Sequence, residues 1–125
     1  DIVDSIYNLA REIVRYKIKR DYTRNFVNKK VEEISTLANL ALDELIKMHK
    51  ESDIENMKRI RKKIQELEQK GDYIKDFLLD YSYNNARTFK SFYHMNELAH
   101  KGDDVLDACE DSSDLLLASI NSIIT

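Results

Sequence analysis

The chain has 125 residues, a formal net charge of −3, no proline and only two glycines. This length suits one domain with a single core, and the shortage of turn residues argues against β-rich folds. The negative charge disfavours a general nucleic-acid binder, and a single cysteine excludes a disulfide framework and indicates a reducing, cytoplasmic setting.

Apolar residues recur at steps of three and four along the whole chain, which predicts long helices. The first helix is expected over residues 1–20 and the second over residues 24–50. The third is expected to follow an N-cap at Ser52 or Asp53 and to end near residue 83, and the fourth to follow Asn84 and Asn85. Residues expected on the buried sides include Ile2, Ile6, Leu9 and Ile13 in the first helix and Met95, Leu106, Cys109 and Ile123 in the last.

Short turns between heptad-patterned helices predict an antiparallel arrangement. The expected fold is therefore an all-α antiparallel helical bundle of about four long helices, with turns near residues 21–23, 50–53 and 84–88 and no strand. No apolar segment has the length of a membrane span. The first helix begins within a periodic pattern and without Met, so we expect the chain to be part of a longer protein.

The segment 103–114 contains six carboxylates and neither Lys nor Arg. Asp103, Asp107 and Asp111 recur every four residues, which places them on one face of a helix, where like charges repel. Glu68 and Asp72 have the same spacing on the preceding helix. Counting outward from the turn between these two helices places the two pairs opposite each other.

Both glycines fall on the predicted apolar seams of these two helices, Gly71 on one and Gly102 on the other. The same count sets them at one level, which predicts a close approach of the two backbones at that point. Carboxylates that converge beside such a crossing form an oxygen-rich site for hard cations. The alternative is a solvated acidic face paired with lysines such as Lys70 and Lys75, and the spacing leaves both readings open.

Two motifs carry a resemblance to a known family. The segment Leu67-Glu68-Gln69-Lys70-Gly71-Asp72-Tyr73-Ile74 resembles the Leu-Glu-x-x-x-Asp-x-Ile signature of PhoU-like proteins. The segment Asp107-Ala108-Cys109-Glu110-Asp111 resembles the Asp-x-Cys-Glu-Asp segment of phosphate-transport regulators known as Pit accessory proteins. The resemblance covers nearly the whole chain, aligned to the downstream portion of that family.

The resemblance implies two repeats of three helices, of which residues 1–20 would be the last helix of a truncated first repeat and residues 21–125 a complete PhoU-like repeat. It also implies a non-catalytic regulator of inorganic phosphate uptake, peripheral to the inner membrane face beside a phosphate transporter. Its metal-binding acids map onto Glu68, Asp72, Asp103, Asp107 and Asp111, with iron or another divalent cation as the bound metal. Asn8 departs from this pattern, because it stands in the first helix where Asp111 stands in the last.

Two other functions compete with this interpretation. A scaffold or partner-binding bundle without metal would use the apolar side of the first helix to bind another chain. Separately, the chain is expected to form a homo-oligomer. A di-iron carboxylate enzyme is suggested by Glu97-Leu98-Ala99-His100, but this fold needs a second Glu-x-x-His motif, which the chain lacks. His49 and His94 are expected at the surface or an interface without companions, and Cys109 is expected to be a core residue.

Overall fold

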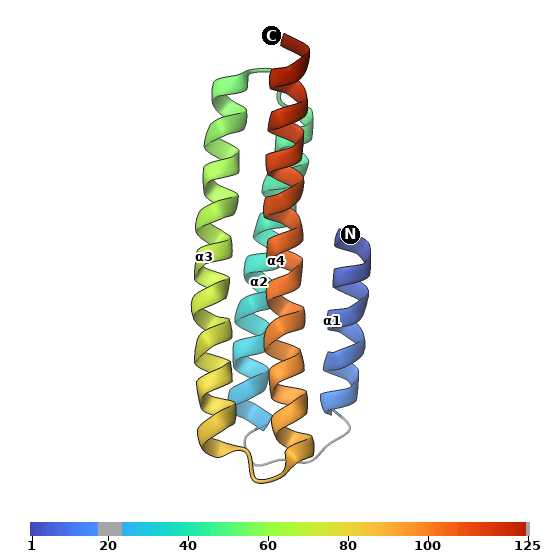
Figure 1. Cartoon of the computed structure of the whole chain (residues 1–125), viewed down its shortest axis with the longest axis vertical. Helices are drawn as coiled ribbons and strands as arrows, with labels where there is room; N and C mark the ends of the chain where they lie inside the picture. Colours follow the sequence, from blue (N-terminus) through green and yellow to red (C-terminus); the bar gives the residue numbers. More distant parts are fainter. Residues whose placement is uncertain (18–23, 125) are drawn as a thin grey trace.

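The computed structural model describes residues 1–17 and 24–124, and these form four long helices that pack side by side in a bundle (Figure 1). The helices are α1 (Ile2–Lys17), α2 (Arg24–Lys50), α3 (Ile54–Asn85) and α4 (Phe89–Ile124). The described residues contain no strand, and the predicted all-α bundle of antiparallel long helices is confirmed. The predicted turn at 21–23 and the end of the first helix at residue 20 lie outside the described residues.

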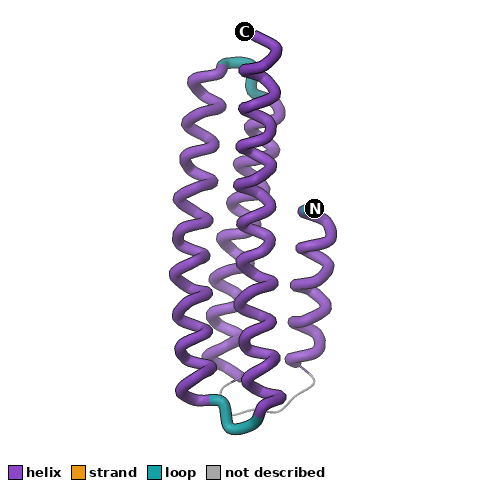
Figure 2. Tube along the Cα trace, viewed as in Figure 1, coloured by secondary structure: helices purple, strands orange, loops and turns teal. Residues whose placement is uncertain are grey.

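The boundaries that the structure describes follow from local hydrogen bonds. Asp53 caps α3, because its Oδ1 accepts a hydrogen bond from the Glu55 N–H at 3.2 Å. Thr88 does the same for α4, with its Oγ1 accepting from the Ser91 N–H at 3.1 Å. The turns 51–53 and 86–88 are each three residues long and lie at opposite ends of the bundle (Figure 2). Such short connections oblige consecutive helices to run antiparallel.

Helices α2, α3 and α4 pack against one another around one apolar core. Its largest fully buried side chains come from all three helices and include Ile34, Ile64, Leu78, Met95 and Leu106. Within the described part of the chain, the backbone of α1 comes close to α4 alone. Leu9 of α1 nevertheless reaches Val105 of α4 and Ala38 of α2 through a small apolar cluster. Helix α1 is therefore attached to one side of a three-helix core (Figure 1).

Two residues expected in the core are on the surface. Ile6 of α1 is 41% exposed and Ile123 of α4 is 80% exposed. The periodicity placed both on an apolar side, but no described helix covers these positions closely. Helix α1 has one close neighbour, and the last turns of α4 rise past the other helices (Figure 1).

Gly71 and Gly102, expected at one level where the two backbones approach closely, are both buried. A Cβ at Gly71 would lie 2.1 Å from Cδ1 of Leu106, so this glycine admits a leucine of α4. A Cβ at Gly102 would lie 2.6 Å from Cγ2 of Ile34, so that glycine admits an isoleucine of α2. Each glycine thus makes room for a large side chain of a different helix, and α4 turns Gly102 towards α2, away from α3.

Candidate metal centre

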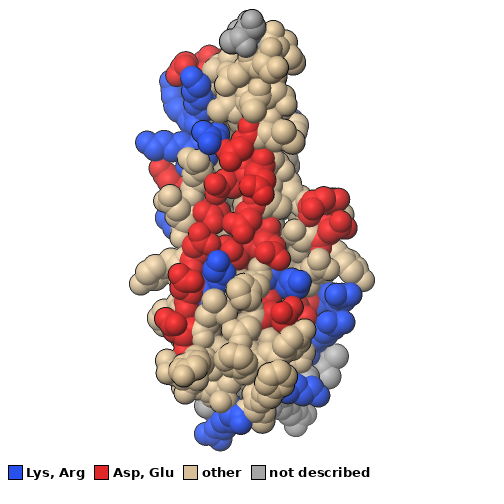
Figure 3. All heavy atoms as spheres, viewed as in Figure 1, with Lys and Arg blue, Asp and Glu red and all other residues tan. Residues whose placement is uncertain are grey.

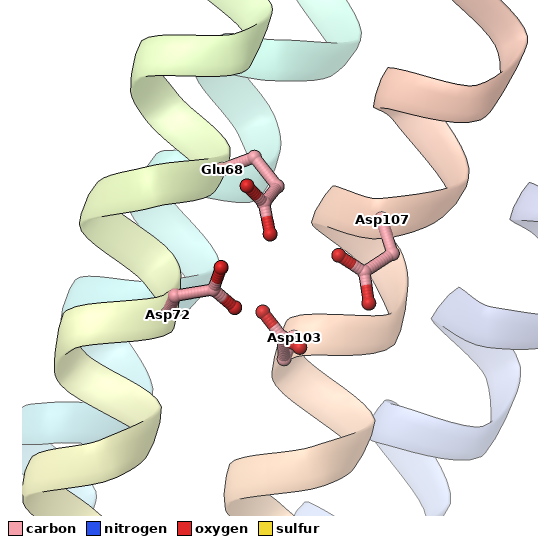
Figure 4. Close-up of side chains that lie close together, drawn as sticks. All are labelled: Glu68, Asp72, Asp103 and Asp107. Carbon is pink, nitrogen blue, oxygen red and sulfur yellow. The ribbon is translucent and has the colours of Figure 1, made fainter.

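Four carboxylates from α3 and α4 converge about midway along these helices (Figure 4). They are Glu68 and Asp72 of α3 and Asp103 and Asp107 of α4. Each offers an oxygen, and these four oxygens lie within 4.8 Å of one another. Residues four apart on a helix share a face, so each helix contributes one vertical pair, and antiparallel packing sets the two pairs side by side. The juxtaposition expected from the sequence is therefore present.

Asp111, the fifth residue predicted as a ligand, is not part of this group. It is exposed, one turn beyond Asp107. Steps of four advance 400° around a helix, so each successive residue in this series is rotated 40° further from the α3 side. The structure instead brings Glu110 towards the cluster, where its carboxylate interacts with Glu68. Glu110 was not among the predicted ligands, because it lies outside the series of steps of four.

Asp103 is the most shielded member, with 4% of its surface exposed. Its Oδ2 accepts a hydrogen bond from the Lys75 ammonium at 3.0 Å. Its Oδ1 is buried and, while the neighbouring carboxyl groups are ionised, accepts no hydrogen bond from any described residue. A buried carboxylate oxygen without a donor is unfavourable by about 1–3 kcal/mol or more, because it has lost its water and gained nothing in exchange.

Lys75 is the cation of the cluster. Its ammonium contacts Asp103 at 3.0 Å and Asp72 at 3.4 Å. The hydrogen bond with Asp103 raises the pKa of Lys75, so it stays charged at neutral pH. The alternative prediction, that lysines pair with the acidic face, is thus correct in part, because one lysine contacts two of the four acids.

The pKa values of the acids indicate that the charge of one lysine does not neutralise the cluster. Burial, hydrogen bonding with Asp72 and Asp107, and repulsion from Asp72 and Glu110 raise the pKa of Glu68 to about 9. Burial and hydrogen bonding with Asp72 raise the pKa of Asp103 to about 7, against the opposing effect of Lys75. Burial also raises the pKa of Glu110, which Asp114, Asp107 and Asp111 repel.

Asp72 behaves differently from its neighbours. Burial alone would raise its pKa, but hydrogen bonds from Glu68 and Asp103 and the nearby Lys75 ammonium lower it. The cluster therefore holds protons on some carboxyl groups and full charge on another at neutral pH. A group of acids that retains protons above its ordinary range is one in which a cation can replace those protons.

The acidic surface extends well beyond the four central residues. Figure 3 shows acidic side chains in a band over α3 and α4, with a group of basic side chains near the end of the bundle that holds the α2–α3 turn. Asp114 at one end of this band is paired with Arg61 of α3. This field attracts cations towards the cluster over and above its local geometry.

Residues considered for other chemistry lie away from this cluster. His100 is exposed, and Glu97 is 3.9 Å from the Lys101 ammonium, so the Glu-x-x-His pattern forms no part of the acidic group. Cys109 is buried as predicted, and burial raises the pKa of its thiol to about 11, which keeps it protonated and unreactive. His49 is exposed, as expected.

The expectation that His94 lacks a companion is wrong. Its Nδ1 lies 2.8 Å from Oε1 of Glu12, across the α1–α4 interface. Glu12 is 3% exposed, and its second oxygen lies 3.4 Å from the Arg15 guanidinium. The sequence held a usable signal, because Glu12 lies next to Ile13 on the side of α1 that carries Leu9, where an acid requires a partner.

None of the described helices contains an apolar segment of the length that crossing a bilayer requires. No family model, no curated protein and no solved structure matches this chain.

Proposed function

We propose that this protein binds a divalent cation between α3 and α4, with Glu68, Asp72, Asp103 and Asp107 as ligands. The observation that carries the proposal is the convergence of four carboxylate oxygens within 4.8 Å, one of the four residues being Asp103 with a buried oxygen that lacks a partner. An all-carboxylate ligand set suits hard cations such as Mg²⁺, Ca²⁺, Mn²⁺ or Fe²⁺. Such an ion would coordinate the buried oxygen of Asp103 and replace the protons that the cluster retains.

We further propose that the bound ion serves a regulatory role rather than catalysis. The support is the pair of motifs that resemble PhoU-like phosphate-transport regulators, which contain Glu68, Asp72 and Asp107 of the cluster. On this proposal the chain acts in the cytoplasm at the inner membrane face, beside a transporter of inorganic phosphate. A metal-free scaffold is the second candidate, favoured by the contacts of Lys75 with Asp72 and Asp103.

The test is calorimetric titration of chelator-treated protein with Mn²⁺, Fe²⁺, Mg²⁺, Ca²⁺ and Zn²⁺. We expect wild type to bind at least one of them and the variant Asp72→Asn/Asp107→Asn to lose most of the affinity. The matched control is Asp76→Asn/Asp80→Asn, which removes two exposed acids with the same spacing from α3 and should bind as wild type does. Equal losses in both variants would mean that the effect is general electrostatics, and no binding by wild type would favour the scaffold.

The transport role needs a separate measurement in cells. Phosphate uptake is compared in cells that lack the protein, in cells that regain it, and in cells that carry Asp72→Asn/Asp107→Asn. We expect uptake to change when the protein is removed and to be restored by the wild-type chain alone. Restoration by the variant would separate any transport role from the metal.

A further inference from the structure

The outer side of α1 is apolar and uncovered. Its exposed residues recur at steps of four, three and four, and they are Val3, Tyr7, Ala10 and Val14. The two valines and the tyrosine are 59–72% exposed. This spacing is the heptad pattern of a helix that packs against another helix. The stripe is distinct from the side of α1 that faces α4, where Leu9 and the Glu12–His94 pair are buried.

Beside this stripe runs an apolar groove between α1 and α2. Its volume is about 200 Å³, Ile6, Ala10 and Ile13 form one wall, and Ala38 and Leu42 of α2 form the other. Val105 of α4 closes its floor. The backbones of α1 and α2 do not approach each other in the described part of the chain, so side chains of a further helix fit between them.

The charges of α1 point to what packs there. Asp1 and Asp4 lie at its start, whereas Arg11 and Arg15 lie in its second half, and Asp1, Asp4, Arg11 and Arg15 are all exposed. A second α1 that runs antiparallel to the first places the acidic turn of each copy beside the arginines of the other. A parallel second copy would instead set like charges together, and it would also align the two helix dipoles unfavourably.

Side-chain sizes favour the same arrangement. An antiparallel pair centred between Tyr7 and Ala10 sets Tyr7 of one copy against Ala10 of the other and Val3 against Val14. The largest residue of the stripe then meets the smallest at the centre of the seam, and valine meets valine at each end, which favours close packing of two helices. From these observations we propose that two copies of this chain associate through α1, antiparallel, with the stripe of one copy against the stripe of the other and the groove of each copy alongside the seam. This surface is separate from the acidic cluster, and the proposal does not depend on metal binding.

The first test is sedimentation velocity over about 1–200 μM, a range chosen because a contact based on one helix of about 24 Å is small and suits micromolar affinity. We expect a concentration-dependent dimer. Ala10→Arg should leave the helix content unchanged and abolish the dimer at all these concentrations. Tyr83→Arg, which changes an 82% exposed residue of α3, is the control and should dimerise as wild type does.

Direction is tested by charge exchange. Asp4→Arg and Arg11→Asp should each weaken the dimer, and the double variant Asp4→Arg/Arg11→Asp should restore it. A double variant that remains as weak as the single ones overturns the antiparallel pairing. A wild type that is monomeric throughout, or an Ala10→Arg variant that still dimerises, overturns the proposal and leaves the groove to another partner.

Register is tested by cross-linking under mild oxidation. Val3→Cys/Val14→Cys should give a covalent dimer, because the two positions meet across the seam. Val3→Cys alone should not, since the two copies of residue 3 lie roughly 16 Å apart along the helix axis in this arrangement. Efficient cross-linking of the single variant would contradict the register.

Discussion

Two buried carboxylates lie at the interfaces that α4 makes with other helices, and they differ in how completely they are paired. Glu12 is 3% exposed and Asp103 is 4% exposed. Glu12 has a partner at each oxygen, His94 at 2.8 Å and Arg15 at 3.4 Å. Asp103 has Lys75 at one oxygen and, while its neighbours are ionised, no hydrogen-bond donor among the described residues at the other, and further acids surround it.

The comparison separates structural acids from candidate ligands. A buried acid whose oxygens are both paired contributes by holding two helices together, and it has no capacity left for a ligand. A buried acid with a free oxygen, near other acids, is unfavourable in the isolated protein, and a cation can recover that free energy. The same residue type at the same burial thus has opposite consequences, which the following predictions test.

The largest effect is expected from opening the Glu12 pair. His94→Leu leaves the Glu12 carboxylate buried with Arg15 alone and should lower the free energy of unfolding by about 3 kcal/mol. Asp103→Asn, measured with chelator present, should change it by less than about 1 kcal/mol, because the lost contact with Lys75 is offset by relief of repulsion. Urea unfolding monitored by circular dichroism measures both.

The control for this pair is His49→Leu, since His49 is exposed and its Nδ1 lies 3.1 Å from the carbonyl oxygen of Leu45 in its own helix. It should change stability by less than about 0.5 kcal/mol. Equal losses for His94→Leu and Asp103→Asn would contradict the distinction between the two acids.

The pH dependence of metal-free stability should come from the cluster. Glu68 and Asp103 have pKa values raised to about 9 and about 7 from ordinary values of 4.5 and 3.8. Between the ordinary and the raised pKa values, the folded chain holds more protons than the unfolded chain. The stability that these two protonated groups contribute is therefore complete below about pH 4 and is lost as pH rises towards 9. The loss should be smaller than that from His94→Leu, because water screens the partly exposed members.

Thermal melts at about pH 5, 7 and 9 with chelator check this slope. Glu68→Gln/Asp103→Asn should flatten it. Stabilisation by added metal should grow over the same range, because the ion competes with fewer protons. A wild-type slope that rises with pH would be the opposite sign and would exclude this account.

Lys75 should compete with the metal. Its ammonium lies 3.4 Å from Asp72 and 3.0 Å from Asp103, so Lys75→Gln removes a positive charge beside two of the four acids and should tighten binding by on the order of tenfold. The same variant without metal should be less stable than wild type. Calorimetric titration measures the metal affinity, and thermal melts with chelator measure the metal-free stability. The control is Lys70→Gln, which changes an exposed lysine of the same helix.

A small net effect on stability is expected at Gly71. In Gly71→Ala the added Cβ collides with Cδ1 of Leu106, the end of a flexible side chain, while better helix propensity returns up to about 1 kcal/mol. We expect a net change within about 1 kcal/mol but a severalfold weaker metal site, because α3 shifts from α4 beside Asp72. Gly102→Ala, which meets the branched Ile34, should be the less stable variant and the better metal binder. Equal metal affinity in both would show that the cluster tolerates this shift.

Much of the architecture was readable from the order of residues. Apolar spacing and the lack of proline predicted the all-α bundle, Asp53 was recognised as an N-cap candidate, and Cys109 was expected in the core. These features depend on interactions within a few residues or on one period along a helix. The four converging acids also belong here, because antiparallel packing after a short turn fixes which residues lie at one level.

Tertiary structure decided the features that depend on how each helix is rotated about its axis. Counting residues from a turn predicts how far along the bundle a residue lies, but it leaves the direction of its side chain around the helix axis undetermined by tens of degrees. In the structure Gly102 is directed towards Ile34, and Asp111 lies outside the cluster. Rotation also determines the number of neighbours, so that Ile6 lies on the surface although its pattern is that of a core residue. The Glu12–His94 pair joins residues 82 positions apart, and only the packing of α1 on α4 brings them into contact.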